Sequence, residues 1–158
     1  MSLPPPPSQQ PVGTPVIETL RAGTRLVRVH GTHAPDSVNP TPQPSRLRGS
    51  RFDSLDGDYA YTYLGQDARA AVAETLCRDL PVGGAARLVP RSSLTGRRVS
   101  AVEVVRDLPV LVFHGAALTQ VGAPLDLTKS GAGEYLTTRD WARALRDWLP
   151  DVAGFRRS

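Results

Sequence analysis

The sequence predicts an α+β fold: a single domain with a central, mostly antiparallel sheet and flanking helices. RLVRVH at 25–30 has apolar residues at strand-like density, and VSAVEVV at 99–105 is rich in β-branched residues; both patterns are typical of strands. Two longer segments, 67–80 and 137–149, instead carry apolar residues at helical spacing. A chain of 158 residues is long enough to bury one hydrophobic core.

The first 22 residues have a different composition from the rest. They contain six prolines separated by serine, glutamine and a few apolar residues. Such a segment buries too little apolar surface to offset the entropy lost on ordering. We expect a disordered, Pro-rich tail at 1–22 and a domain at 23–158 that opens with the strand 25–30. A second proline-rich stretch, 31–50, is expected to be a long surface loop.

A turn and a strand are predicted next. The Asp56-Gly57 pair is a common chain-reversal signal. From Tyr59 to Gly65 tyrosines alternate with small or aliphatic residues, which predicts a strand with its tyrosines on one face. A row of tyrosines fits ordinary packing with wet hydroxyls, and it also fits a stacking platform.

Asp67 is a suitable N-cap for the first helix, which is expected to end at Leu80 before a proline. Its predicted buried stripe comprises Val72, Ala73, Leu76, Cys77 and Leu80. Glu74 lies on the other side of such a helix, where Arg78 at i+4 would be an ordinary ion-pair partner.

The remaining elements follow from similar patterns. Short strands are predicted at 86–89, 99–105 and 110–113, and a single helical turn or a loop is predicted within 118–127. Thr137 or Thr138 is expected to cap a helix that ends at Leu149, and a last strand is expected to start within 152–155. The buried face of this helix should comprise Trp141, Ala144, Leu145 and Trp148.

Composition excludes several functional classes. The net charge is +4 and the pI is about 9.8, but the arginines are scattered and no reader motif is present, so no direct nucleic-acid binding is expected. No apolar run reaches the roughly 18 residues of a membrane span. The single cysteine and the absence of a signal peptide favour the cytoplasm. The histidines are too dispersed for a metal site, and His30 and His33 are interpreted as solvated loop residues.

Several blocks of the sequence resemble one family. The run RFDSLDGDYAYTYLGQDARAAVAETLCR at 51–78 resembles the signature of the RES domain, the toxin half of RES-Xre toxin-antitoxin systems. LVRVH at 26–30 resembles the family's opening strand, and DLTKSGAGEYLTTRDWARALRDWLPDVAGF at 126–155 resembles its later block. The resemblance extends from Arg25 to the C-terminus.

This resemblance implies a fold similar to that of ADP-ribosyltransferases and an NAD-degrading activity, by hydrolysis or phosphorolysis. NAD would be the substrate and inorganic phosphate a candidate co-substrate, with no further cofactor and no metal. The implied partner is an Xre-type helix-turn-helix antitoxin, in a complex that can contain several toxin copies. Two alternatives stay open: an inactive module that still binds the antitoxin, and an ADP-ribosyltransferase that modifies a protein.

The family's functional residues match particular positions here. Arg28 corresponds to the arginine of the first strand, Arg51 to the arginine before the turn, Tyr63 to a tyrosine and Glu74 to the helical glutamate. The resemblance implies that Glu74 and Arg28 are catalytic and that Arg28, Arg51 and Tyr63 bind NAD. The family's serine is expected where this sequence stops, so Ser158 is its provisional equivalent and the chain is expected to be C-terminally truncated.

The chemistry of these residue types suits that reaction. Cleavage of the nicotinamide-ribose bond passes through an oxocarbenium-like state, which a carboxylate such as Glu74 can stabilise. Guanidinium groups bind the two phosphates through paired hydrogen bonds. A tyrosine ring can stack on nicotinamide.

Overall fold

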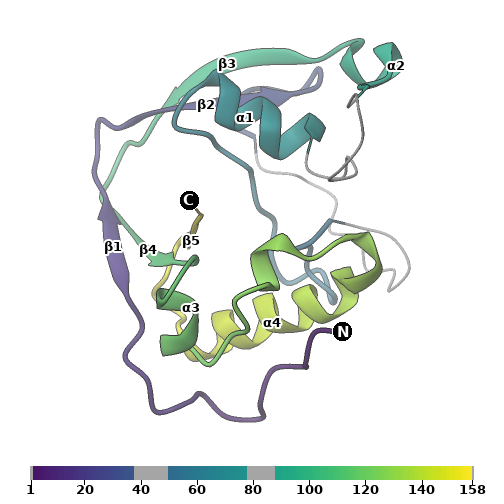
Figure 1. Cartoon of the computed structure of the whole chain (residues 1–158). Coiled ribbons are helices and arrows are strands. Elements are labelled where there is room, and N and C mark those ends of the chain that lie inside the picture. The colour runs from purple at the N-terminus through teal and green to yellow at the C-terminus, as the bar shows by residue number, and fades with distance from the viewer. Residues whose placement is uncertain (1, 38–49, 78–87, 158) are drawn as a thin grey trace. The chain divides into compact units, whose positions relative to one another are not determined.

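The structure is a computed structural model that describes residues 2–37, 50–77 and 88–157. The chain divides into two compact units, each built from separate stretches of sequence. The first unit comprises 1–21, 41–60 and 107–158, and the second unit comprises 22–40 and 61–106. Both units contain strands and helices, which confirms the α+β class (Figure 1). The strands form two small sheets, whereas one central sheet was expected.

The sheet of the first unit has the order β1-β4-β5, with β1 at Ile17–Leu20, β4 at Leu108–Val112 and β5 at Gly154–Arg156. β1 runs antiparallel to β4, and β5 runs parallel to it. β4 lies between the other two strands, and its last three residues are buried. A short, continuously apolar strand is typical of this central position. The predicted strands at 110–113 and 152–155 are therefore confirmed, with shifted bounds.

The N-terminal residues form hydrogen bonds with later parts of the first unit, although the sequence predicted a disordered tail. The backbone N–H of Leu3 donates to Oε1 of Glu134 at 2.9 Å, and the indole of Trp141 donates to the carbonyl of Pro4 at 2.9 Å. Further along, Ile17–Leu20 is strand β1. Most of these contacts use backbone atoms, and β1 itself is largely exposed. Hydrophobic patterning therefore gives little sign of them.

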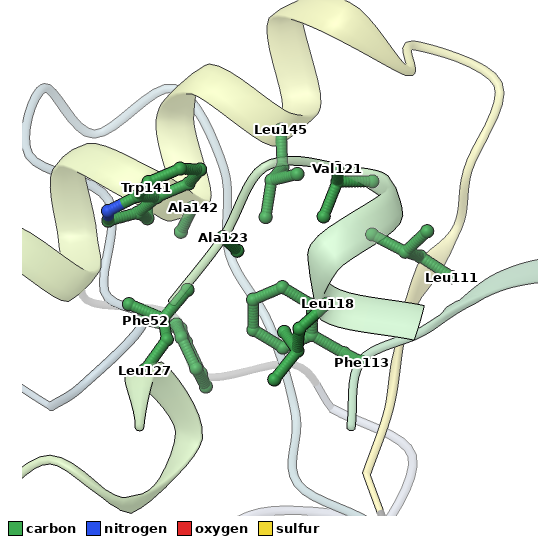
Figure 2. Close-up of a cluster of buried hydrophobic side chains, with 10 residues drawn as sticks. All are labelled: Phe52, Leu111, Phe113, Leu118, Val121, Ala123, Leu127, Trp141, Ala142 and Leu145. Atoms are coloured by element: carbon green, nitrogen blue, oxygen red, sulfur yellow. The ribbon is translucent and has the colours of Figure 1, made fainter. Parts of the chain in front are cut away.

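The core of the first unit lies between α4 (Tyr135–Trp148), the short α3 (Ala117–Gln120) and β4 (Figure 2). Phe52 contributes to it from the turn segment, and its ring meets that of Phe113 edge-on at 5.7 Å. Two 3₁₀ turns, Leu127–Lys129 and Ala132–Glu134, lead into α4. The buried residues are Phe52, Leu111, Phe113, Leu118, Val121, Ala123, Leu127, Trp141, Ala142 and Leu145.

α4 begins at Tyr135, so the predicted cap at Thr137 or Thr138 is wrong. Thr138 lies inside the helix and is fully buried, and its hydroxyl donates to the carbonyls of Tyr135 and Arg51. A threonine hydroxyl can bond a carbonyl of the preceding helical turn, so a threonine can lie inside a helix as well as at its start. On the predicted buried face, Trp141 and Leu145 are buried; Ala144 and Trp148 are half-buried.

The second unit is built on two antiparallel strands, β2 (Arg25–His30) and β3 (Arg98–Glu103). β2 has its predicted bounds, and β3 lies within one to two residues of them. A helix, α1 (Ala68–Val72), lies beside β2 and continues into a π-helical turn, η1 (Ala73–Cys77) (Figure 1). α2 (Arg91–Leu94) is a single turn before β3.

The predicted strand at Tyr59–Gly65 is wrong, because only its last residue pairs with a strand. Gly65 and Val27 exchange two backbone hydrogen bonds of 2.8 Å, and residues 59–64 have no regular structure. Glycine is required there, since a Cβ would lie 2.4 Å from the backbone nitrogen of Ala71. The Asp56-Gly57 turn is confirmed, with Gly57 at φ +86°, a conformation that favours glycine.

The predicted N-cap of the first helix is confirmed. Oδ1 of Asp67 accepts from the backbone N–H of Ala70 at 2.8 Å. The buried stripe differs from the prediction, because Ala71 is buried and Ala73 is exposed. Residues 78–80 of the predicted helix, and 86–87 of the predicted strand 86–89, lie outside the described residues. Within 2–37, 50–77 and 88–157, no helix is long and apolar enough to cross a membrane.

Candidate functional site

The residues predicted for the site are divided between the two units. Arg28, Tyr63 and Glu74 all belong to the second unit, whereas Arg51 belongs to the first. Ser158 lies outside the described residues. The second unit is therefore the one in which the structure brings three predicted site residues into one compact body.

Arg28 is a half-buried residue of β2. Its Nη1 donates to the carbonyl of Pro35 at 2.7 Å and to that of Ser37. Burial lowers the pKa of Arg28, and the carboxylate of Asp36 acts in the opposite direction. A guanidinium stays charged in either case. The carbonyls of residues 35 and 37 thus orient a cation on β2.

Tyr63 is connected to the same strand through the β-bridge. It lies two residues before Gly65, which pairs with Val27, the neighbour of Arg28 in β2. Its half-buried ring meets that of Tyr61 edge-on, with centroids 5.1 Å apart. The two tyrosines come shortly before α1 in the sequence.

Glu74 is the second residue of the π-helical turn η1, and it is half-buried. The sequence predicted an ordinary α-helix here. A π-helical turn spaces bonded residues by five instead of four, which changes the directions of the side chains after α1. Short π-helical turns within helices are frequent at functional sites. The glutamate thus lies in a π-helical turn that directly follows α1, a helix that packs on β2.

Two polar residues near Arg28 were not identified from the sequence. His30 was interpreted as a solvated loop residue, but it is in β2 and only 6% exposed, so that interpretation is wrong. Its Nδ1 lies 2.9 Å from the carbonyl oxygen of His33, and its Nε2 lies 2.9 Å from Oγ of Ser100 in β3. The alternating pattern of β2 places His30 on the same face as Arg28. This alternation within the predicted strand 25–30 could have indicated from the sequence that His30 lies beside Arg28.

Arg51 is buried inside the first unit, with 5% of its surface exposed. Nη1 donates to the carbonyl of Thr128 at 2.6 Å, and Nη2 donates to that of Ser130 at 2.8 Å. Its guanidinium carbon also lies 5.7 Å from the centre of the Tyr135 ring. Nε is buried without a hydrogen-bond partner among the described residues. Binding of phosphate by Arg51 stays a prediction.

The segment that carries Arg51 is fixed to α4. Arg139, only 2% exposed, donates from Nε to the carbonyl of Asp53 at 3.1 Å and from Nη2 to that of Ser54 at 3.0 Å. The hydroxyl of Tyr59 donates to the carbonyl of Phe52 at 2.7 Å, and its ring lies beneath Arg146 at 4.4 Å. By binding the carbonyls of Asp53 and Ser54, this buried arginine satisfies backbone groups that lie outside any helix or strand.

Replacing Tyr59 with phenylalanine is expected to lower the free energy of unfolding by about 1 kcal/mol, because the carbonyl of Phe52 loses its phenol donor. It should also change the pH dependence. Burial raises the pKa of Tyr59 above the value of about 10 found in unfolded chains, so the stability contributed by this phenol is present below pH about 10 and is lost as the pH rises.

The measurement is urea unfolding of both proteins at pH about 8 and about 10.5. The wild type should lose more stability than Tyr59→Phe between these values. An identical loss in wild type and Tyr59→Phe would contradict this role of the phenol.

The chain was compared with protein families, curated proteins and solved structures. A family model of the RES domain matches residues 25–157, which span all elements from β2 to β5. No curated protein and no solved structure matches the chain significantly. Within the described ranges, no group of three or more His, Cys, Asp or Glu side chains could hold a metal ion. The family match covers well over half of the chain, and the chain therefore belongs to the RES domain family.

Proposed function

We propose that this chain cleaves the bond between nicotinamide and ribose in NAD, as the toxin of a cytoplasmic toxin-antitoxin pair. The observation that carries the proposal is the occurrence of Arg28, Tyr63 and Glu74 in one compact unit of a RES domain. These residues match the family's strand arginine, tyrosine and helical glutamate. No metal or additional cofactor is needed for this chemistry.

Each residue has a distinct part in the proposed reaction. The carboxylate of Glu74 stabilises the positive charge that develops on the ribose as the glycosidic bond breaks. Arg28 binds the diphosphate through its guanidinium, whose orientation is supported by the carbonyls of Pro35 and Ser37. The Tyr63 ring stacks on nicotinamide. Nicotinamide leaves as a neutral molecule, so the reaction requires no strong general acid.

The proposal is tested by incubating the purified chain with NAD and measuring nicotinamide by chromatography. Release in phosphate-free buffer with ADP-ribose as the product would identify hydrolysis. Release that depends on added phosphate, with a phosphorylated ADP-ribose product, would identify phosphorolysis. If no nicotinamide forms in either buffer, the chain lacks the proposed activity.

The second candidate function is an inactive module that binds an Xre-type antitoxin. Arg51 favours it, because the two terminal nitrogens of this predicted phosphate ligand already bind carbonyls of the first unit. This alternative predicts association with a helix-turn-helix protein, measured by co-expression and size-exclusion chromatography, without any consumption of NAD. Several toxin copies in such a complex would appear as a larger mass.

Replacing Arg28 with lysine is expected to raise the KM for NAD about tenfold, because an ammonium group cannot form the paired hydrogen bonds of a guanidinium. Steady-state kinetics of nicotinamide release measure this change. Arg25→Lys is the matched control on the same strand, since Arg25 is exposed and its ion pair with Glu103, at 3.9 Å, is exposed as well. An unchanged KM in Arg28→Lys would show that Arg28 does not bind NAD as proposed.

A further inference from the structure

Both ring nitrogens of His30 in β2 have hydrogen-bond partners, and the residue is almost completely buried. Nδ1 lies 2.9 Å from the carbonyl oxygen of His33, and Nε2 lies 2.9 Å from Oγ of Ser100. His30 is 6% exposed, whereas Ser100 on β3 is only partly buried. The proposed function assigns no part to either residue.

These contacts fix the tautomer of the ring. A carbonyl oxygen can only accept a hydrogen bond, so Nδ1 of His30 must carry the proton. In the neutral imidazole Nε2 is then an acceptor, and the hydroxyl of Ser100 donates to it. A hydroxyl hydrogen-bonded to a base, with that base oriented by a third group, is the arrangement that activates a serine as a nucleophile.

The position of Ser100 links it to the proposed NAD site. Ser100 is the residue of β3 that pairs directly with Arg28 of β2. Side chains of directly paired residues lie on the same face, with Cβ atoms about 5 Å apart. If Arg28 binds the diphosphate of NAD, the attached ribose can lie within reach of the Ser100 hydroxyl. His30, on the same face and two residues further along β2, supplies the base from the buried side.

We propose that Ser100 accepts ADP-ribose from NAD, so that the chain modifies itself at this serine. This inference rests on the proposed function. Oγ of Ser100 attacks the anomeric carbon of the nicotinamide ribose while the bond from that carbon to nicotinamide breaks. The electron pair of that bond leaves with nicotinamide, which departs uncharged. The hydroxyl proton moves to Nε2 of His30, which later releases it to solvent. The products are a Ser100 O-linked ADP-ribose, nicotinamide and one proton.

The test is mass spectrometry of the full chain after incubation with NAD, followed by peptide mapping. The wild type should gain one ADP-ribose on the peptide that contains Ser100. Ser100→Ala should gain none, although it should still release nicotinamide. Incubation with free ADP-ribose in place of NAD should give no modification at Ser100, because the reaction requires the nicotinamide leaving group.

His30→Gln tests the base, since glutamine can keep a hydrogen bond to Ser100 but cannot take its proton. We expect about 100-fold slower modification, the usual range for loss of a general base. Circular dichroism checks that the His30→Gln protein is folded. If it is not folded, the peptide mapping of the wild type and of Ser100→Ala still tests whether Ser100 is modified. Ser93→Ala is the matched control, because Ser93 is an exposed serine of α2 in the same unit.

The outcomes separate this inference from the proposed function. Nicotinamide release without modification of Ser100 would overturn the inference and leave the NAD-cleaving function standing. Modification that persists at the same rate in a folded His30→Gln protein would also overturn it, since the base would then have no part. If the wild type releases no nicotinamide, both proposals fail.

Discussion

Replacing Glu74 with glutamine is expected to reduce nicotinamide release at least about 100-fold while the free energy of unfolding changes by less than about 1 kcal/mol. Glutamine has nearly the same shape but no charge, so in the proposed reaction it would fill the same space beside the ribose without stabilising the developing cation. Removing a single electrostatic contact to a transition state costs about 2.7–4 kcal/mol, or 10²–10³ in rate. Because Glu74 is only half-buried, its amide can still be hydrated and the fold should tolerate the change.

The measurement combines steady-state kinetics with NAD and urea unfolding of the same preparations. Glu103→Gln is the matched control, since Glu103 is an exposed carboxylate on β3 in the same unit. It should retain the wild-type rate, because exposed ion pairs contribute little. Wild-type turnover in Glu74→Gln would remove the glutamate from the reaction. A large loss of stability in Glu74→Gln would instead show that Glu74 stabilises the folded protein.

Elements with a complete local signal were predictable from the sequence. β2 has apolar residues at strand-like density, and the first helix has an aspartate cap whose side chain bonds the expected backbone N–H. α4 has a strong apolar stripe, and it was displaced only at its start. In each case the stabilising interactions lie within the element or on one face of it, so the spacing of residues reports them directly.

The failures concern interactions between segments far apart in the sequence. Alternation from Tyr59 to Gly65 satisfied the strand pattern, but a strand also needs a partner along its length, and only Gly65 has one. β1 has a weak pattern of its own, and pairing with β4 holds it in place. A residue's own neighbours cannot reveal such a partner. Tertiary pairing therefore prevailed over local propensity twice. Residues 59–64 have a strand pattern but no strand partner, and β1 has a weak pattern but pairs with β4.

The candidate site was only partly predictable, because the sequence around a residue does not report its contacts with distant segments. Arg28, Tyr63 and Glu74 were predicted from a resemblance to the family, and all three lie in the second unit; their part in a site stays a prediction. The contact between His30 and Ser100 joins residues 70 positions apart in the sequence, so no local pattern signals it. The burial of Arg51 was equally invisible, because its carbonyl partners, Thr128 and Ser130, come from the later part of the chain.

Replacing Arg51 with alanine is expected to lower the free energy of unfolding by about 3–5 kcal/mol. Two charge-assisted hydrogen bonds would be lost, each worth about 1.5–3 kcal/mol, and the carbonyls of Thr128 and Ser130 would be left buried without this donor. Removal of the side chain also leaves a cavity against Tyr135. Lysine should recover only part of this loss, because an ammonium group lacks the planar fork that reaches both carbonyls.

Urea unfolding of Arg51→Ala, Arg51→Lys and the wild type measures the effect, with Arg143→Ala as the matched control. Arg143 is an exposed residue of α4 that lies 3.5 Å from Asp56, and its loss should cost less than about 1 kcal/mol. The same proteins distinguish the two parts that Arg51 could play. A phosphate ligand with no structural part predicts a raised KM for NAD at wild-type stability, whereas an internal anchor predicts lower stability whether or not NAD is present. Wild-type stability in Arg51→Ala would contradict the anchor, because two buried carbonyls cannot lose a charged donor without cost.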